Sequence, residues 1–162
     1  TRIIDGIDES YDKSLPGEDI AKMISEKKAE SYKATMSSDE LIITADTIVY
    51  VDGEVLGKPQ NKIDAARMLK MISGKCHDVI TGVCLLTSNK RISFSVKTKV
   101  SFAQITDDEI SFYIENYKPY DKAGAYGIQE WIGYIGVDSI QGSYFNVMGL
   151  PVQRLYSELK NI

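Results

Sequence analysis

The sequence predicts an α/β protein in which residues 1–162 form a single domain, with helices packed around a mixed, twisted sheet. Apolar, β-branched runs alternate along the chain with segments whose apolar residues recur at helical spacing. The turn signals Asp52-Gly53 and Ser88-Asn89 indicate antiparallel pairs within that sheet. A chain of 162 residues, 43% apolar and 26% charged, has the composition of a globular domain with its own core.

The run Glu40–Val51 predicts a buried strand, which one acid, Asp46, interrupts. A lone buried carboxylate is costly, so Asp46 needs a hydrogen-bond network, a metal or a chemical role. The Asp52-Gly53 turn sends the chain back through Glu54–Leu56, and we expect Lys58 to return towards Asp46. A carboxylate that faces an ammonium group across a cleft could hold a metal-bound phosphate.

The first predicted elements are an extended segment, Arg2–Ile7, and a helix that opens at Pro16-Gly17 and ends near Ala34. The segment ends in Asp8-Glu9, which is either a solvated turn or a metal ligand at the end of a strand.

Lys28 falls on the apolar stripe of that helix, one turn after Ile24. It either snorkels towards the surface or presents a cation to a cleft, and the pattern leaves both interpretations open.

The rest of the chain alternates helices and strands, and Asn61 and Thr106 are the expected N-caps. The predicted elements are a helix over Asn61–Ile72, strands over Val79–Leu86, Arg91–Ala103 and Trp131–Val137, a helix after Thr106, a polar turn over Gln141–Asn146, and a last helix that begins at Pro151 with Val152, Leu155 and Leu159 facing inward.

Composition and single residues exclude several classes of function. The net charge of −4 argues against a nucleic-acid polymer as partner, and no apolar run is long enough to cross a bilayer. Cys76 and Cys84 lie too far apart on one predicted strand to bridge each other, so we expect reduced thiols in a cytoplasmic protein. His77, the only histidine, has no second histidine to share a metal and is expected to be structural.

Six short motifs, in this order along the chain, resemble the Maf family of nucleoside triphosphate pyrophosphatases, historically called septum formation inhibitors. They are Ala45-Asp46-Thr47, Gly57-Lys58-Pro59, Ser73-Gly74-Lys75, Ile80-Thr81-Gly82-Val83, Asp121–Gln129 and Gly142–Pro151. Each motif is weak by itself, whereas six in register are highly specific.

The resemblance implies a sheet with a central cleft and hydrolysis of a nucleoside triphosphate to the monophosphate and pyrophosphate, with Mg²⁺ or Mn²⁺ as cofactor. The Ala-Asp-Thr form together with Gln129 resembles the branch that acts on dTTP and UTP. Modified pyrimidine nucleotides are a further substrate class, and a non-catalytic regulator of cell division or stress that only binds nucleotide is the alternative. Members of this family are often dimers, so a homodimer is one expectation for this chain.

Matched position by position, Asp46 corresponds to the catalytic acid of the family, as a general base or as a metal ligand. Thr47 and Gln129 match positions tied to the choice of base. Lys28 and Lys58 match polar residues of the cleft that contact the substrate, and Glu9 matches another, to which we assign the metal together with Asp46.

Two departures from the family pattern stand out. The family opens with a strand and a Ser-x-Ser-Pro-Arg-Arg loop that contacts the phosphates and the base, and these 162 residues contain no counterpart. We therefore expect the sequence to be a trimmed piece of a longer chain. The second departure is Glu130, where glycine is more usual; a carboxylate there could alter the approach to the base.

Overall fold

Five strands in the order β2-β1-β3-β4-β5 form the sheet of this computed structural model, which describes residues 7–12 and 14–162. The strands are β1 (Ile42–Val51), β2 (Glu54–Leu56), β3 (Cys76–Leu86), β4 (Arg91–Phe102) and β5 (Val137–Gln141). The helices are α1 (Gly17–Lys33), α2 (Lys62–Ile72), α3 (Asp107–Tyr117), the 3-10 helix η1 (Ala123–Ala125), α4 (Trp131–Gly136), α5 (Tyr144–Val147) and α6 (Val152–Leu159).

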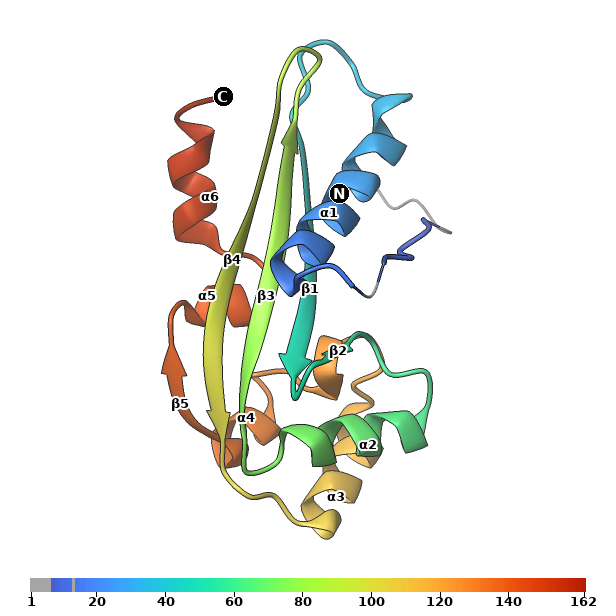
Figure 1. The fold of residues 1–162 in the computed structure, drawn as a ribbon, viewed down its shortest axis with the longest axis vertical. Helices are drawn as coiled ribbons and strands as arrows, with labels where there is room; N and C mark the ends of the chain where they lie inside the picture. Colours follow the sequence, from blue (N-terminus) through green and yellow to red (C-terminus); the bar gives the residue numbers. More distant parts are fainter. Residues whose placement is uncertain (1–6, 13) are drawn as a thin grey trace.

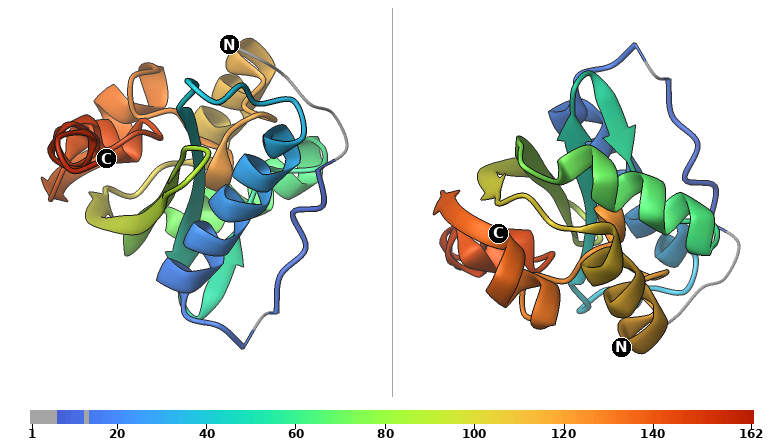
Figure 2. Two further views of the ribbon diagram at one scale, coloured as in Figure 1. Left: turned by 90° about the horizontal axis from the view of Figure 1, so that it is seen from above. Right: turned by 90° about the horizontal axis from the view of Figure 1, so that it is seen from below.

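The long strands β3 and β4 run along the length of the molecule (Figure 1). Helix α1 packs on one face of the sheet, and α5 and α6 lie on the opposite side (Figure 2). Helices α2, α3 and α4 lie together with η1 at one end of the long axis, around the largest apolar cluster. The sheet thus has apolar contacts on both faces, and its strands join the two ends.

The α/β class, with helices packed around the sheet, is confirmed, but the sheet itself corrects one detail. Every strand pairing among the described residues is antiparallel, where a mixed sheet was expected. The two turns read from the sequence, Asp52-Gly53 and Ser88-Asn89, do join antiparallel neighbours. The remaining neighbours are antiparallel as well, so no parallel pair is present in this part of the chain.

The helix caps read from the sequence are confirmed. Oδ1 of Asn61 accepts a hydrogen bond from the backbone N–H of Asp64 over 3.0 Å at the start of α2. Thr106 and Glu109 form a reciprocal capping box at the start of α3. Helix α1 begins and ends within one residue of its predicted bounds.

The predicted strand over Trp131–Val137 is wrong, because this segment is helix α4 up to Gly136, and the strand β5 only begins at Val137. The buried residues of α4 are Ile132, Gly133 and Gly136, which have the spacing of one helical face. A Cβ at Gly133 would lie 1.9 Å from the carbonyl oxygen of Ile128, so glycine is required for this turn to pack.

Two details near the C-terminal end also differ. The expected polar turn over Gln141–Asn146 contains the end of β5 and most of the short helix α5. In α6, Leu155 is buried as predicted and Leu159 packs against the same cluster, whereas Val152 is 41% exposed. Residues 2–6 of the expected extended segment lie outside the described residues.

Cys76 and Cys84 both lie on β3 and are free thiols, as their spacing predicts. Cys76 is exposed and Cys84 is buried. No helix in the described part of the chain has the length and apolar character to cross a membrane.

Candidate active site

The Nζ atom of Lys28 contacts two carboxylates: it lies 2.5 Å from Oδ1 of Asp46 and 2.9 Å from Oε1 of Glu9. Lys28 comes from α1, Asp46 from β1, and Glu9 from the segment that precedes α1. The side chains of Lys28 and Asp46 are only 18% and 10% exposed. Of the two interpretations left open by the sequence, the structure therefore supports a cation presented to a cleft rather than a snorkelling lysine.

The close approach of α1 to the sheet makes this contact feasible. A Cβ at Gly82 of β3 would lie 2.2 Å from the backbone of Ala21, so any side chain there would push the helix away. A second contact fixes the segment before the helix, because Nζ of Lys27 donates to the carbonyl oxygen of Ser10 over 2.6 Å. This bond holds Glu9 next to α1.

The surroundings of Asp46 raise the pKa of its carboxyl group. Burial is the largest cause, and the charge of Glu9 acts in the same direction, while Lys28 and Lys58 oppose it. For Lys28, burial acts to lower the pKa, but the hydrogen bonds and charges of Asp46 and Glu9 outweigh it, and the pKa is raised. Asp46 is thus a stronger proton acceptor than an ordinary aspartate, and it lies beside a lysine that stays charged.

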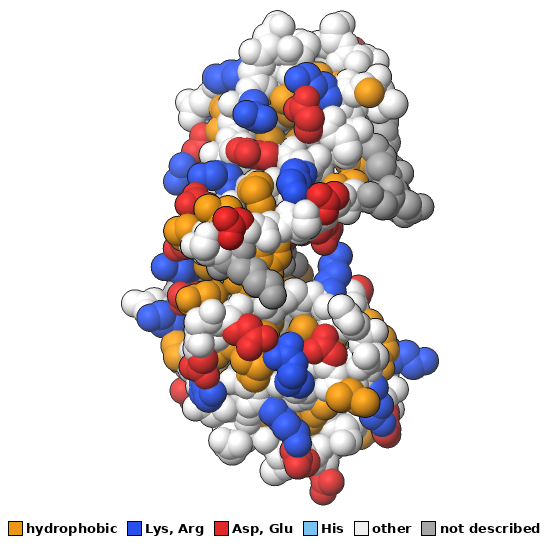
Figure 3. Space-filling view, turned by 45° about the vertical axis from the view of Figure 1, so that its right-hand side comes forward, with side chains coloured by type: hydrophobic (Ala, Val, Ile, Leu, Met, Phe, Trp, Pro, Cys, Tyr) orange, Lys and Arg blue, Asp and Glu red, His pale blue; other side chains and the backbone are white. Residues whose placement is uncertain are grey.

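A pocket of about 360 Å³ opens beside this pair, a volume typical of small-molecule sites. The surface is hollowed between the two ends of the molecule, with basic and acidic side chains at the margin (Figure 3). Five of the six predicted site residues line the pocket: Lys28, Asp46, Thr47, Lys58 and Gln129. Glu9, the sixth, reaches the site through its ion pair with Lys28.

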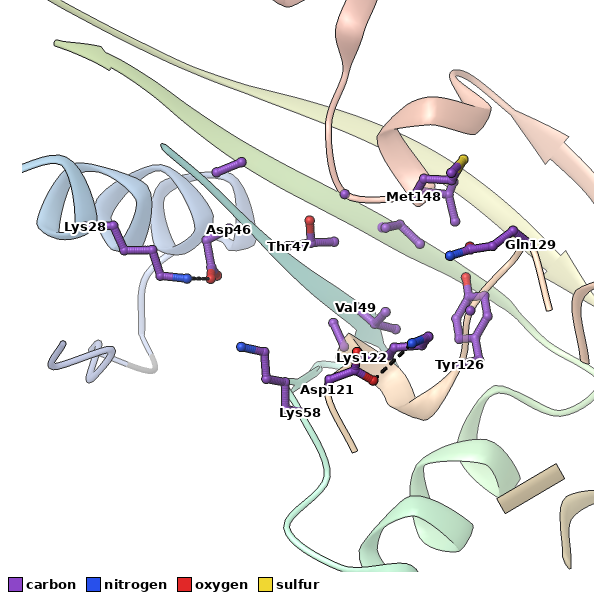
Figure 4. Close-up of a pocket in the computed structure, with 16 residues that line it drawn as sticks. Lys28, Asp46, Thr47, Val49, Lys58, Asp121, Lys122, Tyr126, Gln129 and Met148 are labelled. Carbon is purple, nitrogen blue, oxygen red and sulfur yellow. Dashed lines mark hydrogen bonds and ion pairs between the residues drawn. The ribbon is translucent and has the colours of Figure 1, made fainter. Parts of the chain in front are cut away.

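Lys58 points towards the Lys28–Asp46 pair from the other side of the pocket (Figure 4). Its segment is anchored to η1, because the backbone N–H of Gly124 donates to the carbonyl oxygen of Gly57 over 3.0 Å. Gly124 has φ of +67° and packs against Val49, where a Cβ would come within 2.8 Å of a methyl carbon. Glycine is therefore required sterically at position 124 of the motif over 121–129.

The end of the pocket at Thr47 and Gln129 lies on the other face of β1 from Asp46. Thr47 Oγ1 lies 2.9 Å from Oγ1 of Thr81, its partner across the β1–β3 pairing. Gln129 points across the pocket towards Thr47 (Figure 4). The pocket therefore has a charged end at Lys28, Lys58 and Asp46 and a neutral, hydrogen-bonding pair, Thr47 and Gln129, away from it.

The loop that carries Gln129 is held by a buried network. Tyr113, which is fully buried, donates to Oε2 of Glu130 and accepts from the backbone N–H of Gly127 over 3.0 Å. Oε1 of Glu130 lies 3.3 Å from Nζ of Lys122, which also contacts Asp121. Glu130, the departure from the family pattern, therefore helps to hold the loop that carries Gln129.

Three residues that line the pocket with polar or charged side chains, Asp121, Lys122 and Tyr126, were not predicted as site residues from the sequence. All three lie within Asp121–Gln129, one of the six motifs that resemble the Maf family, so the sequence does carry a signal for this segment. The pattern gives no indication which of its side chains face the pocket, because that depends on the η1 turn and the positive φ of Gly124.

His77 is structural, as expected. It is 2% exposed, its Nε2 lies 2.8 Å from the hydroxyl of Tyr126, and its ring packs against Phe102. Burial lowers the pKa of His77 from 6.5 to about 4, so the ring is neutral at pH 7. His77 thereby supports one wall of the pocket, because Tyr126 lines it.

Two carboxylates of the site could hold a divalent cation. Glu9 and Asp46 present carboxylate oxygens that contact one nitrogen atom, so the two groups are close neighbours. No cluster of three or more protein ligands exists among the described residues. Mg²⁺ is usually bound by one or two carboxylates, with phosphate oxygens and water as the other ligands, and these two residues fit that pattern.

These features define an α/β protein with a small-molecule pocket that combines lysines, a buried acid and neutral hydrogen-bonding groups. The comparison with known families identifies the group. The model described as "Maf-like protein" matches residues 1–162. The chain therefore belongs to the Maf family.

Curated relatives agree with this assignment. A protein of Phocaeicola vulgatus, named dTTP/UTP pyrophosphatase, is 60% identical over 161 residues, which cover 99% of this chain and 83% of that protein. Proteins with the same name from Parabacteroides distasonis and Bacteroides thetaiotaomicron are 57% and 52% identical, over 160 and 161 residues, with the same coverage of both chains.

Proposed function

We propose that this protein is a nucleoside triphosphate pyrophosphatase that hydrolyses dTTP and UTP to the monophosphate and pyrophosphate. The observation that carries the proposal is the Lys28–Asp46 pair, which places a buried acid with a raised pKa in one pocket with Thr47 and Gln129. The names of relatives at 52–60% identity support the same activity and the same two substrates.

In this proposal the lysines bind and orient the triphosphate. Phosphoryl transfer depends on alignment and charge neutralisation more than on covalent chemistry. Lys28 and Lys58 lie on opposite sides of the pocket and offset the charge of the phosphate chain. Lys28 already holds Oδ1 of Asp46, so binding of a phosphate oxygen would share this ammonium between ligand and acid.

Asp46 is the group to which we assign the proton of the attacking water. A general base works best when its pKa lies nearer the working pH than that of a free carboxylate, and burial shifts Asp46 in that direction. Oδ1 is engaged by Lys28, so Oδ2 is the oxygen that would receive the proton. Water attacks the α-phosphorus, the α–β phosphoanhydride bond breaks, and pyrophosphate leaves.

We further propose that Mg²⁺ or Mn²⁺ is bound by Glu9 and Asp46 together with phosphate oxygens. When bound, a divalent cation offsets the charge that develops on the phosphate and lowers the pKa of a coordinated water. Glu9 and Asp46 would then exchange part of their contact with Lys28 for the cation, which frees the ammonium group for the phosphates.

The test is a panel of dTTP, UTP, CTP, GTP and modified pyrimidine triphosphates, with monophosphate and pyrophosphate measured separately. We expect both products in equal amounts from dTTP and UTP and less from the purine. Tight binding without product from any nucleotide would overturn the proposal in favour of a non-catalytic regulator. Release of orthophosphate instead of pyrophosphate would place the attack at another phosphorus. A homodimer, location in the cytoplasm and the absence of a nucleic-acid polymer partner stay predictions.

A further inference from the structure

A chain of hydroxyl groups leads from Thr47 in the pocket into the core. Oγ1 of Thr47 lies 2.9 Å from Oγ1 of Thr81, which lies 3.1 Å from the backbone carbonyl oxygen of Asn146. Thr81 and Asn146 are both 0% exposed. The direction of the hydrogen bonds in this chain follows from its last member.

A carbonyl oxygen only accepts, so the hydroxyl of Thr81 must be the donor in its bond to Asn146. A hydroxyl carries one proton, so Thr81 has none left for Thr47. The bond between the two hydroxyls is therefore donated by Thr47. The hydroxyl proton of Thr47 is therefore used inside the protein, and Thr47 can only accept hydrogen bonds from a ligand in the pocket.

The acceptor at the end of the chain is held in place. The side-chain amide of Asn146 donates to the carbonyl oxygen of Val79 over 3.1 Å and to Oγ1 of Thr98 over 3.0 Å. Because Thr81 is sealed from water, no solvent molecule offers its hydroxyl another acceptor. The polarity of Thr47 is thus set by Thr81 and Asn146, neither of which lines the pocket.

We infer that Thr81, through its hydrogen bond to Asn146, fixes Thr47 as a pure hydrogen-bond acceptor and so makes the site select pyrimidines that carry a ring N–H. Thymine and uracil present an N–H donor between two carbonyl groups, whereas cytosine presents a bare ring nitrogen acceptor at that position. An acceptor facing that nitrogen attracts the first two and repels cytosine. Thr81 acts through Thr47 and is a positioning residue.

Gln129 cannot make this choice by itself, because its amide carries both donors and an acceptor and can rotate to suit either base. It faces Thr47 across the pocket (Figure 4). The backbone of Gly149 approaches Thr47 without a side chain, and a Cβ there would lie 3.6 Å from Oγ1. Thr47 therefore supplies the fixed partner and Gln129 the adaptable one. This inference rests on the proposed function.

The test compares kcat/KM for UTP and CTP in wild type, Thr81→Val and Thr81→Ser. Valine keeps the shape of threonine and removes the hydroxyl, which frees the proton of Thr47 to point into the pocket. We expect the UTP/CTP ratio to fall at least tenfold in Thr81→Val, chiefly through faster use of CTP. Serine keeps the hydroxyl and should keep the ratio within about twofold of wild type. A purely structural role for Thr81 would slow both substrates alike, and that result would overturn the inference.

Thr44→Val is the matched control, since Thr44 lies on β1 with Thr47, but its hydroxyl donates to the carbonyl oxygen of Ser25 in α1, on the other face of the sheet. Its ratio should equal that of wild type. Circular dichroism checks folding, and Thr81→Ala replaces the valine variant if that variant unfolds. If wild type releases no pyrophosphate, the proposed function fails. The ratio of dissociation constants for α,β-imido analogues of UTP and CTP then tests Thr81 by itself, and an unchanged ratio in the valine variant overturns it.

Discussion

Asp46 and Thr47 are neighbours in β1, yet their side chains lie on opposite faces of the sheet and line the same pocket. Asp46 contacts Lys28 of α1, while Thr47 contacts Thr81 on the side of α5. β2 pairs only with Val49–Val51, so among the described residues no strand covers this edge of β1 beside Asp46 and Thr47. A ligand that wraps around this edge can reach the acid with one end and the hydroxyl with the other.

Asp46→Asn should lower the rate of pyrophosphate release by at least about a hundredfold, since it keeps the shape of the side chain and removes the proton acceptor. The melting temperature should stay close to that of wild type. Asp52→Asn is the matched control, because Asp52 lies in the exposed turn after the same strand and pairs with Lys75. An Asp46→Asn enzyme within tenfold of wild type would reject Asp46 as the catalytic group.

The pH dependence of kcat/KM should reflect the raised pKa of Asp46. As the pH falls through that pKa, the acid takes up a proton and activity is lost, so the acid limb of kcat/KM lies above the pH expected for an ordinary aspartate. Removing the charge of Glu9 removes one cause of the raised pKa. Glu9→Gln should therefore move the acid limb to lower pH, whatever it does to the maximal rate. A limb that stays in place would show that the titrating group is not Asp46.

Gln129→Ala should weaken discrimination among bases more than it slows turnover, because Gln129 is exposed at the end of the pocket that it shares with Thr47, away from Lys28 and Asp46. The measurement is kcat/KM for UTP, CTP and GTP. Gln153→Ala, on the exposed surface of α6, serves as the control. Equal slowing with all three nucleotides would count against a role in base choice.

Tyr113→Phe should raise KM for UTP several-fold with a smaller effect on kcat. The variant removes the hydroxyl that accepts from the backbone N–H of Gly127 and donates to Oε2 of Glu130, so the loop that carries Gln129 loses part of its support. Loss of hydrogen bonds to a buried hydroxyl also costs about 1–3 kcal/mol of stability, measurable by urea unfolding. A kinetic profile identical to wild type would mean that the network supports the core but not the site.

Protein stability should fall as the pH drops from 7 to 4 because of His77. Its pKa is about 4 in the folded state and 6.5 when exposed, so the unfolded chain binds the proton first and acid favours unfolding. The difference corresponds to about 3 kcal/mol below both values. His77→Gln removes the titrating ring and keeps a partner for Tyr126, and its free energy of unfolding should depend less on pH over this range. An unchanged slope would assign the acid sensitivity to other groups.

The site residues that could be predicted from the sequence are those whose charge interrupts an apolar strand or helix stripe. Asp46 interrupts an apolar strand and Lys28 an apolar helix stripe, and both line the pocket because each needs a partner that only the site provides. Thr81 gives no such signal: a threonine in a strand is ordinary, and its contact with Thr47 depends on the register of two strands. For α4, the run of aromatic and β-branched residues favoured a strand, whereas the segment folds as a helix whose close contact with Ile128 requires glycine at Gly133.

The pairing of Thr47 with Thr81 and of Asp46 with Gly82 has a consequence for how this chain can vary. Side chains alternate along a strand, so deleting or inserting one residue within β1 would exchange the acid and the hydroxyl between the two sides of the sheet. Both halves of the ligand would lose their partners in a single event, although no functional residue had been replaced. Length changes should therefore be absent from β1 in active homologues and collect instead in the Ser88-Asn89 turn, which lies beyond the pairing that aligns the site.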